Sequence, residues 1–375
     1  MSTGEEQLGM RSGISVVLAG GGSAGHTSPL IATAEELKRL DPNVRLAAVG
    51  TARGLETTVV PAAGLRLELI PPVPVPRRPS VDLVLVAPRL WRAVAAAVAV
   101  LRRVRADVVL GFGGYVSAPV YLAARRLGVP IVLHEQNALP GLANRLAARL
   151  TRHVYTSFPE TPLPHASYIG LPMRRAITEL DRAGLRRAAR EQFQLGAELP
   201  VLLVSGGSQG AQSINTAVLG ARERLLAAGV QILHVLGPKN MTDQTVATAD
   251  EETGARYSPV GYVERMEQAY AAADLMLGRC GASTVLETAA VGLPAIFVPY
   301  PHGNGEQARN ARAVLQAGGG VLLDDADCTS DRVASEVLTL ALNRERLAGM
   351  SATLRGVAKV DAARVLAQRA LEVVS

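Results

Sequence analysis

The sequence predicts an α/β protein built from two doubly wound parallel sheets, one in each half of the chain. Its 375 residues are enough for two domains, and 48% of them are hydrophobic, so each domain can bury a core. Short β-branched runs recur, each followed by a turn and a longer helical stretch. Because these runs are apolar on both faces, they are typical of central parallel strands covered by helices. Alternating β and α units of this kind form an open sheet with helices on both sides.

Six strands are expected in each half. In the first half they are residues 14–19, 44–49, 67–70, 107–110, 131–134 and 153–156. In the second half they are residues 201–205, 231–236, 257–260, 274–277, 295–298 and 321–323. Clustered prolines between residues 157 and 172 predict an extended linker, because proline stiffens the chain. We therefore expect an N-terminal domain over residues 1–168, a C-terminal domain over 169–357, and a last helix over about 358–375.

Composition and charge narrow the functional classes. The formal net charge is +6, and aromatic residues make up only 3%, which argues against a protein that stacks nucleic-acid bases. Two cysteines, Cys280 and Cys328, are too few for a disulfide framework or a cysteine-rich zinc site and fit a reducing compartment. The first residues lack a secretory pattern, and the longest apolar run, residues 93–101, is shorter than the ~20 residues of a membrane span. We expect a soluble cytoplasmic protein that binds no nucleic acid.

Two glycine-rich loops follow the first strand of each half. Residues 20–25 (GGGSAG) open the first predicted helix, and residues 206–211 (GGSQGA) open its counterpart. Glycines let the backbone approach a ligand, and the free N–H groups of a helix start favour an anion. The first loop fits the dinucleotide pattern G-x-G-x-x-G, but Val49-Gly50-Thr51 stands where a dehydrogenase has its ribose-binding acid. A dehydrogenase is therefore disfavoured, and two such domains suggest a ligand cleft between them. In the simpler alternative, each loop only closes a strand-to-helix turn.

Polar side chains stand at the carboxyl ends of further strands, where such sheets form their ligand crevice. Tyr115 follows a third glycine turn, and His134, Glu135 and Asn137 follow the next strand. A histidine or a carboxylate there can move a proton, and an amide can orient a hydroxyl. The alternative is a set of hydrogen bonds that only hold the loops.

The second half carries two polar segments after its later strands. Residues 281–287 (GASTVLE) are expected to form a loop that enters a helix. Thr284 and Glu287 match a capping box, which would use the glutamate to hold the backbone. Alternatively, Glu287 accepts hydrogen bonds from both hydroxyls of a ribose while the helix N-terminus faces phosphate. Residues 302–307 (HGNGEQ) are unusually polar for a plain connector.

Residues 76–92 are basic and apolar together. They combine Arg77, Arg78, Arg89 and Arg92 with Trp91 and aliphatic side chains. Such an element is typical of a contact with an anionic membrane surface, where each positive charge contributes about 1 kcal/mol. The alternative is an ordinary surface helix packed on the sheet.

Six segments in this order resemble the MurG family of peptidoglycan glycosyltransferases, which add N-acetylglucosamine to a lipid-linked muramyl-pentapeptide. The resemblance runs from about Ile14 to the last helix and so covers nearly the whole chain. Each segment alone is a modest signal, whereas the six in order are specific. The segments are residues 21–26, 113–115, 134–137, 206–211, 281–287 and 302–307.

The resemblance implies a GT-B fold, with two Rossmann-like domains, an interdomain cleft and a last helix that returns to the N-terminal domain. It implies that UDP-N-acetylglucosamine is held mostly by the C-terminal domain and an undecaprenyl-linked muramyl-pentapeptide by the N-terminal one, without a cofactor. The enzyme would be peripheral, on the anionic cytoplasmic face of the cell membrane.

The resemblance also implies roles for individual residues. Ser208 and the loop around Val263 would touch phosphate and uracil, and Gln307 would contact the sugar. Glu287 would hold the ribose. The diphosphate would lie on the helix start formed by Ala282, Ser283, Thr284, Val285 and Leu286. The residues expected to close over the donor from the other domain are Ser23, Ala24, Gly25 and Asn137, with Arg174 near the linker, and Tyr115 is expected to bind a substrate.

The implied reaction is a single displacement with inversion at the anomeric carbon. UDP leaves, and a sugar hydroxyl of the acceptor attacks from the opposite face. A helix N-terminus can stabilise the leaving diphosphate without a metal, and residues 324–327 (DDAD) are expected to be solvated beyond the last strand. His26, at the mouth of the first glycine loop, is the first candidate for the general base, because the positive helix end favours its neutral form. His134 and Glu135 are the alternatives.

Two other classes remain open. A related GT-B enzyme would glycosylate a small secondary metabolite or epimerise a UDP-sugar at its second carbon, although the basic apolar segment favours a lipid acceptor. A non-catalytic paralogue of the cell-wall machinery would bind the UDP-sugar without turnover.

Overall fold

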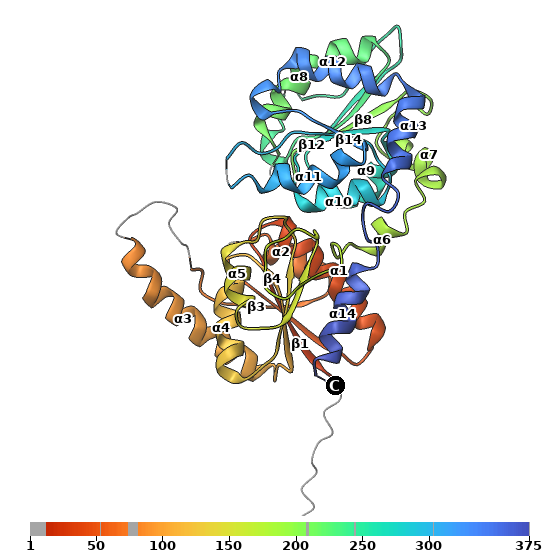
Figure 1. The fold of residues 1–375 in the computed structure, drawn as a ribbon. Helices are drawn as coiled ribbons and strands as arrows, with labels where there is room; N and C mark the ends of the chain where they lie inside the picture. Colours follow the sequence, from red (N-terminus) through yellow and green to blue (C-terminus); the bar gives the residue numbers. More distant parts are fainter. Residues whose placement is uncertain are drawn as a thin grey trace, which may run out of the picture.

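The computed structural model describes residues 13–52, 54–73, 82–207, 210–243, 245–302 and 304–374. These residues form two α/β bodies, one above the other in Figure 1, and each is built on a seven-stranded sheet. The two doubly wound domains predicted from the alternation of strands and helices are confirmed.

The first sheet has the order β3-β2-β1-β4-β5-β6-β7, and every pairing in it is parallel. Its strands are β1 Ser15–Gly20, β2 Arg45–Gly50, β3 Arg66–Leu69, β4 Val108–Gly113, β5 Ile131–Glu135, β6 His153–Thr156 and β7 Ala166–Tyr168. The helices between them are α1 Ala24–Leu40, α2 Glu56–Ala62, α3 Asp82–Arg103, α4 Ser117–Leu127 and α5 Leu142–Ala147. The strand order reverses between β1 and β4, so the loops after these two strands open where such sheets bind ligands.

The second sheet has the order β10-β11-β9-β8-β12-β13-β14, and only its short edge strand β10 is antiparallel. Its strands are β8 Val201–Ser205, β9 Gln231–Val235, β10 Thr248–Ala249, β11 Arg256–Val260, β12 Leu275–Gly278, β13 Ala295–Phe297 and β14 Gly320–Leu322. Its helices are α6 Arg175–Thr178, α7 Arg182–Gln192, α8 Gln212–Ala227, α9 Met266–Ala272, α10 Ala282–Ala290, α11 Glu306–Gln316, α12 Ser330–Ala341 and α13 Arg344–Thr353, with 3-10 turns at Pro238–Asn240 and Asp325–Asp327. Helices α10 and α11 face the first body, and α8 and α12 cover the far side (Figure 1).

The last helix, α14 (Ala362–Glu372), lies against the first body and not the second. Its buried Leu366, Ala367 and Ala370 share one apolar cluster with Leu30 and Leu37 of α1. The chain therefore crosses between the two bodies twice, once after β7 and once before α14.

Two strands were missed by the sequence patterns, and one of them corrects the linker. β7 lies within residues 157–172 and joins the edge of the first sheet next to β6, so part of the expected linker is a strand. It has only three residues, all at least partly exposed, and so carries no apolar run. β10 has only two residues and likewise carries no apolar run. Edge strands of this length depend on pairing and not on a hydrophobic pattern.

Two buried histidines predict that stability depends on pH. Burial lowers the pKa of both His134 and His234 to about 4, whereas an unfolded histidine titrates near pH 6.5. Between these values the unfolded chain binds more protons than the folded one, so each histidine removes up to about 3 kcal/mol of stability as the pH falls from about 6.5 to 4. Urea unfolding across this range should show the loss. The variant His234→Gln should give a shallower slope, and an unchanged slope would contradict this assignment.

Candidate active site between the two domains

The two domains are joined at the candidate site by one buried amide. Asn310 of α11 donates from Nδ2 to the Cys280 carbonyl (3.1 Å) and to Asn137 Oδ1 of the first domain (3.3 Å). Its Oδ1 accepts from the backbone N–H of Ala138 (2.9 Å). Asn137, predicted to close over the donor, is thus held at the interface by the second domain. No sequence motif pointed to Asn310, because its partners lie 30 to 173 positions away.

Removal of this amide should loosen the interface. In Asn310→Ala the buried Ala138 N–H and Cys280 carbonyl lose their partners, and each such loss costs about 1–3 kcal/mol. We expect a lower unfolding temperature and a KM for the donor raised about tenfold. In Asn310→Asp the acceptor for Ala138 remains, but a carboxylate oxygen then faces the Cys280 carbonyl in a fully buried site, so the loss of stability should be at least as large as in Asn310→Ala. Equal stability and KM in all three proteins would refute the bridging role.

Helix α10 directs its N-terminus into this junction. Its N-cap is Gly281, which has no side chain to bond the first turn, so the N–H groups of Ala282, Ser283 and Thr284 have no acceptor within the helix. The Ser283 hydroxyl is also buried and has no hydrogen-bond partner among the described residues. Unpaired donors at a helix start attract an anion. The side chains of Val285 and Leu286 are buried in the core of the second domain, which leaves only their backbone to the site.

Glu287 does not form the capping box. Helix α10 begins before Thr284, and the Glu287 carboxylate accepts a hydrogen bond from the Tyr270 hydroxyl (2.9 Å) of α9. Burial raises the pKa of Glu287, while the Tyr270 bond and the Arg174 charge counteract this rise. Arg174, just beyond the linker, also lies 3.8 Å from Glu267. The carboxylate is therefore turned away from the backbone, as a ribose-binding group requires.

The first glycine loop is held by a carboxylate that the sequence patterns missed. Glu56 of α2 accepts from the backbone N–H of Gly22 (2.8 Å) and of Thr51 (2.9 Å), and from the Thr51 hydroxyl (3.1 Å). A Cβ on Gly21 would lie 2.8 Å from this carboxylate, so the loop needs glycine there. Burial alone would raise the pKa of Glu56, but the donated hydrogen bonds lower it below its usual value. The dinucleotide rule sought an acid at the end of β2, whereas this one lies further on and serves the loop itself.

The same loop presents Ser23, Ala24 and Gly25 at the start of α1. Ser23 is its N-cap in an extended conformation, and its side chain makes no capping bond. The glycine turn at residues 113–114 packs directly against this loop, since a Cβ on Gly114 would lie 2.5 Å from the Gly21 carbonyl. Tyr115, which follows, is 58% exposed.

His26 lies where these two turns meet. It comes from the first turn of α1, and its Nδ1 lies 2.9 Å from the Phe112 carbonyl oxygen and 3.1 Å from Gln136 Oε1. The ring is only partly buried. Of the three candidate bases, His26 alone remains partly open to solvent.

The structure argues against His134 and Glu135 as the base. His134 is fully buried, and its Nε2 donates to the Gly170 carbonyl (2.9 Å). Glu135 is buried as well and accepts from the N–H groups of Asn137 and Gly141 and from the amide of Asn144. Burial raises the pKa of Glu135, with these hydrogen bonds and the nearby His26 acting in the opposite sense. Glu135 holds the loop that carries Asn137, His134 bonds the segment at Gly170, and both side chains are closed to solvent.

Three further residues, Ser208, Val263 and Gln307, were predicted to contact the donor. Ser208 lies outside the described residues. Val263 is buried in the loop after β11, and Gln307, at the start of α11, accepts from the Tyr300 N–H (2.9 Å). Val263 and Gln307 both lie in the second domain at the carboxyl side of its sheet. The Gln307 contact fixes the segment around Tyr300 and leaves its amide N–H group for other partners.

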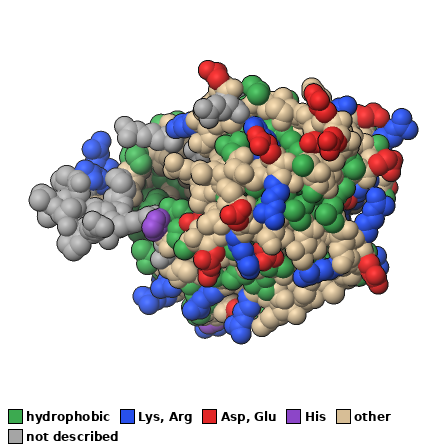
Figure 2. Space-filling view, turned by 90° about the horizontal axis from the view of Figure 1, so that it is seen from above, with side chains coloured by type: hydrophobic (Ala, Val, Ile, Leu, Met, Phe, Trp, Pro, Cys, Tyr) green, Lys and Arg blue, Asp and Glu red, His purple; other side chains and the backbone are tan. Residues whose placement is uncertain are grey.

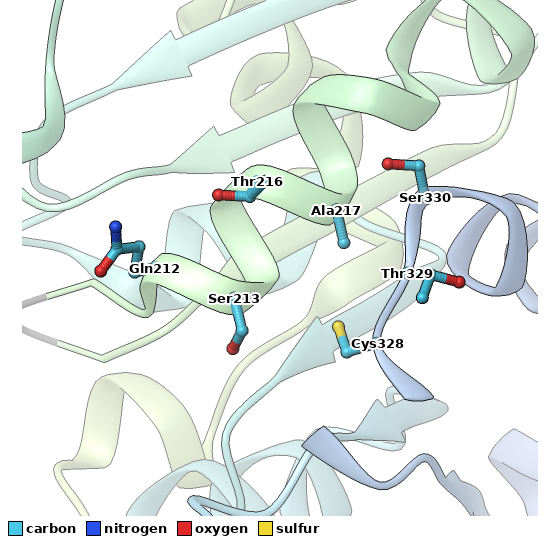
Figure 3. Close-up of a pocket in the computed structure, with 7 residues that line it drawn as sticks. All are labelled: Gln212, Ser213, Thr216, Ala217, Cys328, Thr329 and Ser330. Atoms are coloured by element: carbon cyan, nitrogen blue, oxygen red, sulfur yellow. The ribbon is translucent and has the colours of Figure 1, made fainter. Parts of the chain in front are cut away.

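The acidic segment 324–327 is not simply solvated. Asp325 accepts from the Ser213 hydroxyl (2.7 Å) and pairs with Arg279 (2.5 Å), whose guanidinium lies over the Tyr300 ring. In the described part of the chain no group of three or more His, Cys, Asp or Glu side chains is arranged to hold a metal ion. A cavity of about 540 Å³ lies beside this cluster, between α8 and α12 (Figure 3). It contains none of the predicted site residues and lies on the far side of the second sheet.

The basic apolar segment is described only in part. Residues 76–81, which include Arg77 and Arg78, lie outside the described residues. The described part of the segment begins α3, where Trp91 is 73% exposed and Arg92 is exposed. None of the described helices combines the length and the hydropathy that a bilayer crossing needs. The outer face of the second domain differs from this basic segment, because it carries basic (Arg, Lys) and acidic (Asp, Glu) side chains intermixed (Figure 2).

Comparisons with known proteins find matches to both domains of the chain. Residues 16–156 match the glycosyltransferase family 28 N-terminal domain, and residues 201–367 match the glycosyltransferase family 28 C-terminal domain. The chain is 56% identical over 357 residues to the UDP-N-acetylglucosamine--N-acetylmuramyl-(pentapeptide) pyrophosphoryl-undecaprenol N-acetylglucosamine transferase of Nocardioides sp., covering 95% of this chain and 97% of that protein. It is 53% identical over 366 residues to the protein of the same name from Mycolicibacterium smegmatis, covering 96% and 94%.

Solved structures show the same fold. The chain is similar to the crystal structure of Acinetobacter baumannii MurG, with a TM-score of 0.75 and 26% identity, covering 96% of this chain and 99% of that one. It is also similar to the Streptomyces sp. SF2575 glycosyltransferase SsfS6, with a TM-score of 0.64, 15% identity and coverage of 96% and 99%. At that identity the second likeness shows the fold alone.

Proposed function

Because this chain belongs to the family of UDP-N-acetylglucosamine–N-acetylmuramyl-(pentapeptide) pyrophosphoryl-undecaprenol N-acetylglucosamine transferases, we propose that it makes the lipid-linked disaccharide of peptidoglycan. It transfers N-acetylglucosamine from UDP-N-acetylglucosamine to an undecaprenyl-pyrophosphoryl muramyl-pentapeptide. The observation that carries this proposal is 56% identity over 95% of the chain, a span that includes both domains and the junction between them. The likeness to secondary-metabolite glycosyltransferases is confined to the fold.

The proposed donor site is formed mainly by the second domain. The diphosphate lies at the N-terminus of α10, where unpaired N–H groups and the helix dipole stabilise the charge that develops as UDP leaves. Glu287, oriented by Tyr270, accepts hydrogen bonds from the ribose hydroxyls. Val263 borders the uracil, Ser208 contacts phosphate, and Gln307 contacts the sugar. Arg174 supplies a positive charge beside Glu287.

The first domain binds the lipid-linked acceptor and supplies the base. Ser23, Ala24, Gly25 and Asn137 close over the donor, and Tyr115 contacts a substrate beside them. The acceptor hydroxyl oxygen attacks the anomeric carbon from the face opposite UDP, and its proton passes to His26. The bond between the anomeric carbon and the phosphate oxygen breaks, and its electron pair leaves with UDP. A single displacement of this kind inverts the anomeric centre.

A direct assay tests the transfer. The protein is incubated with radiolabelled UDP-N-acetylglucosamine and lipid-linked muramyl-pentapeptide, and the mixture is extracted with organic solvent. We expect label in the organic phase only when both the protein and the lipid acceptor are present. Label that stays entirely in water would reject a lipid acceptor, and UDP-sugar binding without any product would indicate a non-catalytic paralogue.

Helix α3 is the proposed contact with the anionic, cytoplasmic face of the membrane. Exposed Trp91 and Arg92 support this proposal, since an indole sits at the headgroup level and each arginine adds about 1 kcal/mol near anionic lipid. Arg92→Glu should lower partitioning onto phosphatidylglycerol vesicles about tenfold or more. The matched control is Arg346→Glu on α13 of the second domain. Equal sedimentation of the two variants with vesicles would place the membrane contact elsewhere.

A further inference from the structure

Both hydrogen-bonding neighbours of His26 Nδ1 are acceptors. One is the Phe112 carbonyl oxygen at 2.9 Å, and the other is Gln136 Oε1 at 3.1 Å. A carbonyl oxygen has no hydrogen to give, so Nδ1 must carry the proton that makes these contacts. A neutral imidazole has one N–H group. Its Nε2 therefore keeps a lone pair, and this atom has no hydrogen-bond partner among the described residues.

The orientation of the Gln136 amide follows from its other end. Gln136 is buried, and its Nε2 lies 3.0 Å from the His134 carbonyl oxygen and 3.2 Å from His134 Nδ1. The carbonyl can only accept, so the NH₂ group must face His134. The amide oxygen is then turned to His26. A flipped amide would leave the His134 carbonyl facing an oxygen, which costs free energy in a buried site.

His134 completes the chain of contacts. Its Nε2 lies 2.9 Å from the Gly170 carbonyl oxygen and so carries a proton, which leaves Nδ1 to accept from Gln136. Burial holds the pKa of His134 at about 4, so the ring is neutral near pH 7. The two histidines are thus fixed as opposite tautomers, with Nδ1–H in His26 and Nε2–H in His134. The chain ends at Gly170, in the segment between the two domains.

We propose that Gln136 is a positioning residue, which holds His26 as the Nδ1–H tautomer with a basic Nε2, and that His134 acts by orienting Gln136. This rests on the proposed role of His26 as the base. It gives the buried His134 a function other than proton transfer. It also separates Gln136 from its neighbours Glu135 and Asn137, which hold the loop and the domain interface.

The first test needs no substrate. In the full chain with ¹⁵N-labelled histidine, the two ring nitrogens of each neutral histidine give distinct chemical shifts for the protonated and unprotonated atom. Variants His26→Gln and His134→Gln assign the signals among the six histidines. We expect Nδ1–H for His26 and Nε2–H for His134 near pH 7.5. An Nε2–H tautomer for His26 in the unmodified chain would overturn the proposal, whether or not the protein transfers sugar.

The second test removes the acceptor atom. Gln136→Met keeps the length of the side chain and leaves the Phe112 carbonyl as the sole acceptor, so the Nε2–H form of His26 should gain population. We expect kcat to fall about tenfold, a part of what a general base contributes, with the KM for UDP-N-acetylglucosamine unchanged. Gln231→Met, at a buried glutamine of the second domain that bonds the Gly196 backbone, is the matched control and should leave kcat unchanged.

The possible outcomes distinguish the positioning role of Gln136 from the assignment of His26 as the base. A wild-type kcat in Gln136→Met, or a raised KM with an unchanged kcat, would refute the positioning role. If His26→Ala also keeps its activity, His26 is not the base. The tautomers of His26 and His134 are then judged from the ¹⁵N spectrum alone. If Gln136→Met does not fold, an Nε2–H tautomer of His26 in the spectrum of the unmodified chain still overturns the proposal.

Discussion

Replacing His26 with alanine should lower kcat by about 10²- to 10⁴-fold, the range that a positioned general base contributes. His26 is the partly exposed candidate, whereas His134 and Glu135 are buried and bonded within the first domain. The KM for UDP-N-acetylglucosamine should change little, because the donor is bound mainly by the second domain. Initial rates at saturating donor and acceptor measure the effect.

The matched control for this variant is His153→Ala. His153 is an exposed histidine at the start of β6 in the same domain, and its loss should leave kcat within about twofold. If His26→Ala turns over within a few-fold of the unmodified enzyme, His26 is not the base.

Replacing Glu287 with glutamine should raise the KM for UDP-N-acetylglucosamine about 10- to 100-fold, with a smaller effect on kcat. Hydrogen bonds to a charged acceptor are worth about 1.5–3 kcal/mol, and glutamine keeps the shape of the side chain without its charge. Titration calorimetry with UDP should show the same loss, since the nucleotide alone carries the ribose.

Two further variants sharpen this prediction. Tyr270→Phe keeps the carboxylate and removes the hydroxyl that orients it, so the loss of UDP affinity should be smaller than in Glu287→Gln. Glu223→Gln, at an exposed position on α8, should bind UDP normally. Unchanged UDP binding by Glu287→Gln would show that this carboxylate does not contact the ribose.

Much of the fold was readable from the sequence because its strands are fully buried. β1, β4, β5, β8 and β9 are buried on both faces, so a mainly hydrophobic run marks each of them to within a few residues. β7 and β10 were missed because they are short edge strands held by pairing. Sequence patterns detect a strand through a run of buried apolar residues, and neither edge strand contains such a run.

The candidate site could be predicted from the sequence only where a motif depends on residues that are neighbours in the chain. The glycine loops and the start of α10 follow from chain geometry near each position. The capping box at Thr284 failed because α10 begins two residues earlier, which frees Glu287 to bond Tyr270, 17 positions away. Asn310 and Glu56 were missed for the same reason, since their partners come from other elements. Contacts of this kind are set by the tertiary structure and leave no spacing to recognise.

A crystal structure of the full chain with UDP tests the central claim most directly. The account predicts the diphosphate on the N–H groups at the start of α10, the ribose hydroxyls within hydrogen-bond distance of Glu287, and the first glycine loop facing the nucleotide from the other domain. Nucleotide bound in the cavity between α8 and α12, or anywhere away from the junction of the two domains, would contradict it.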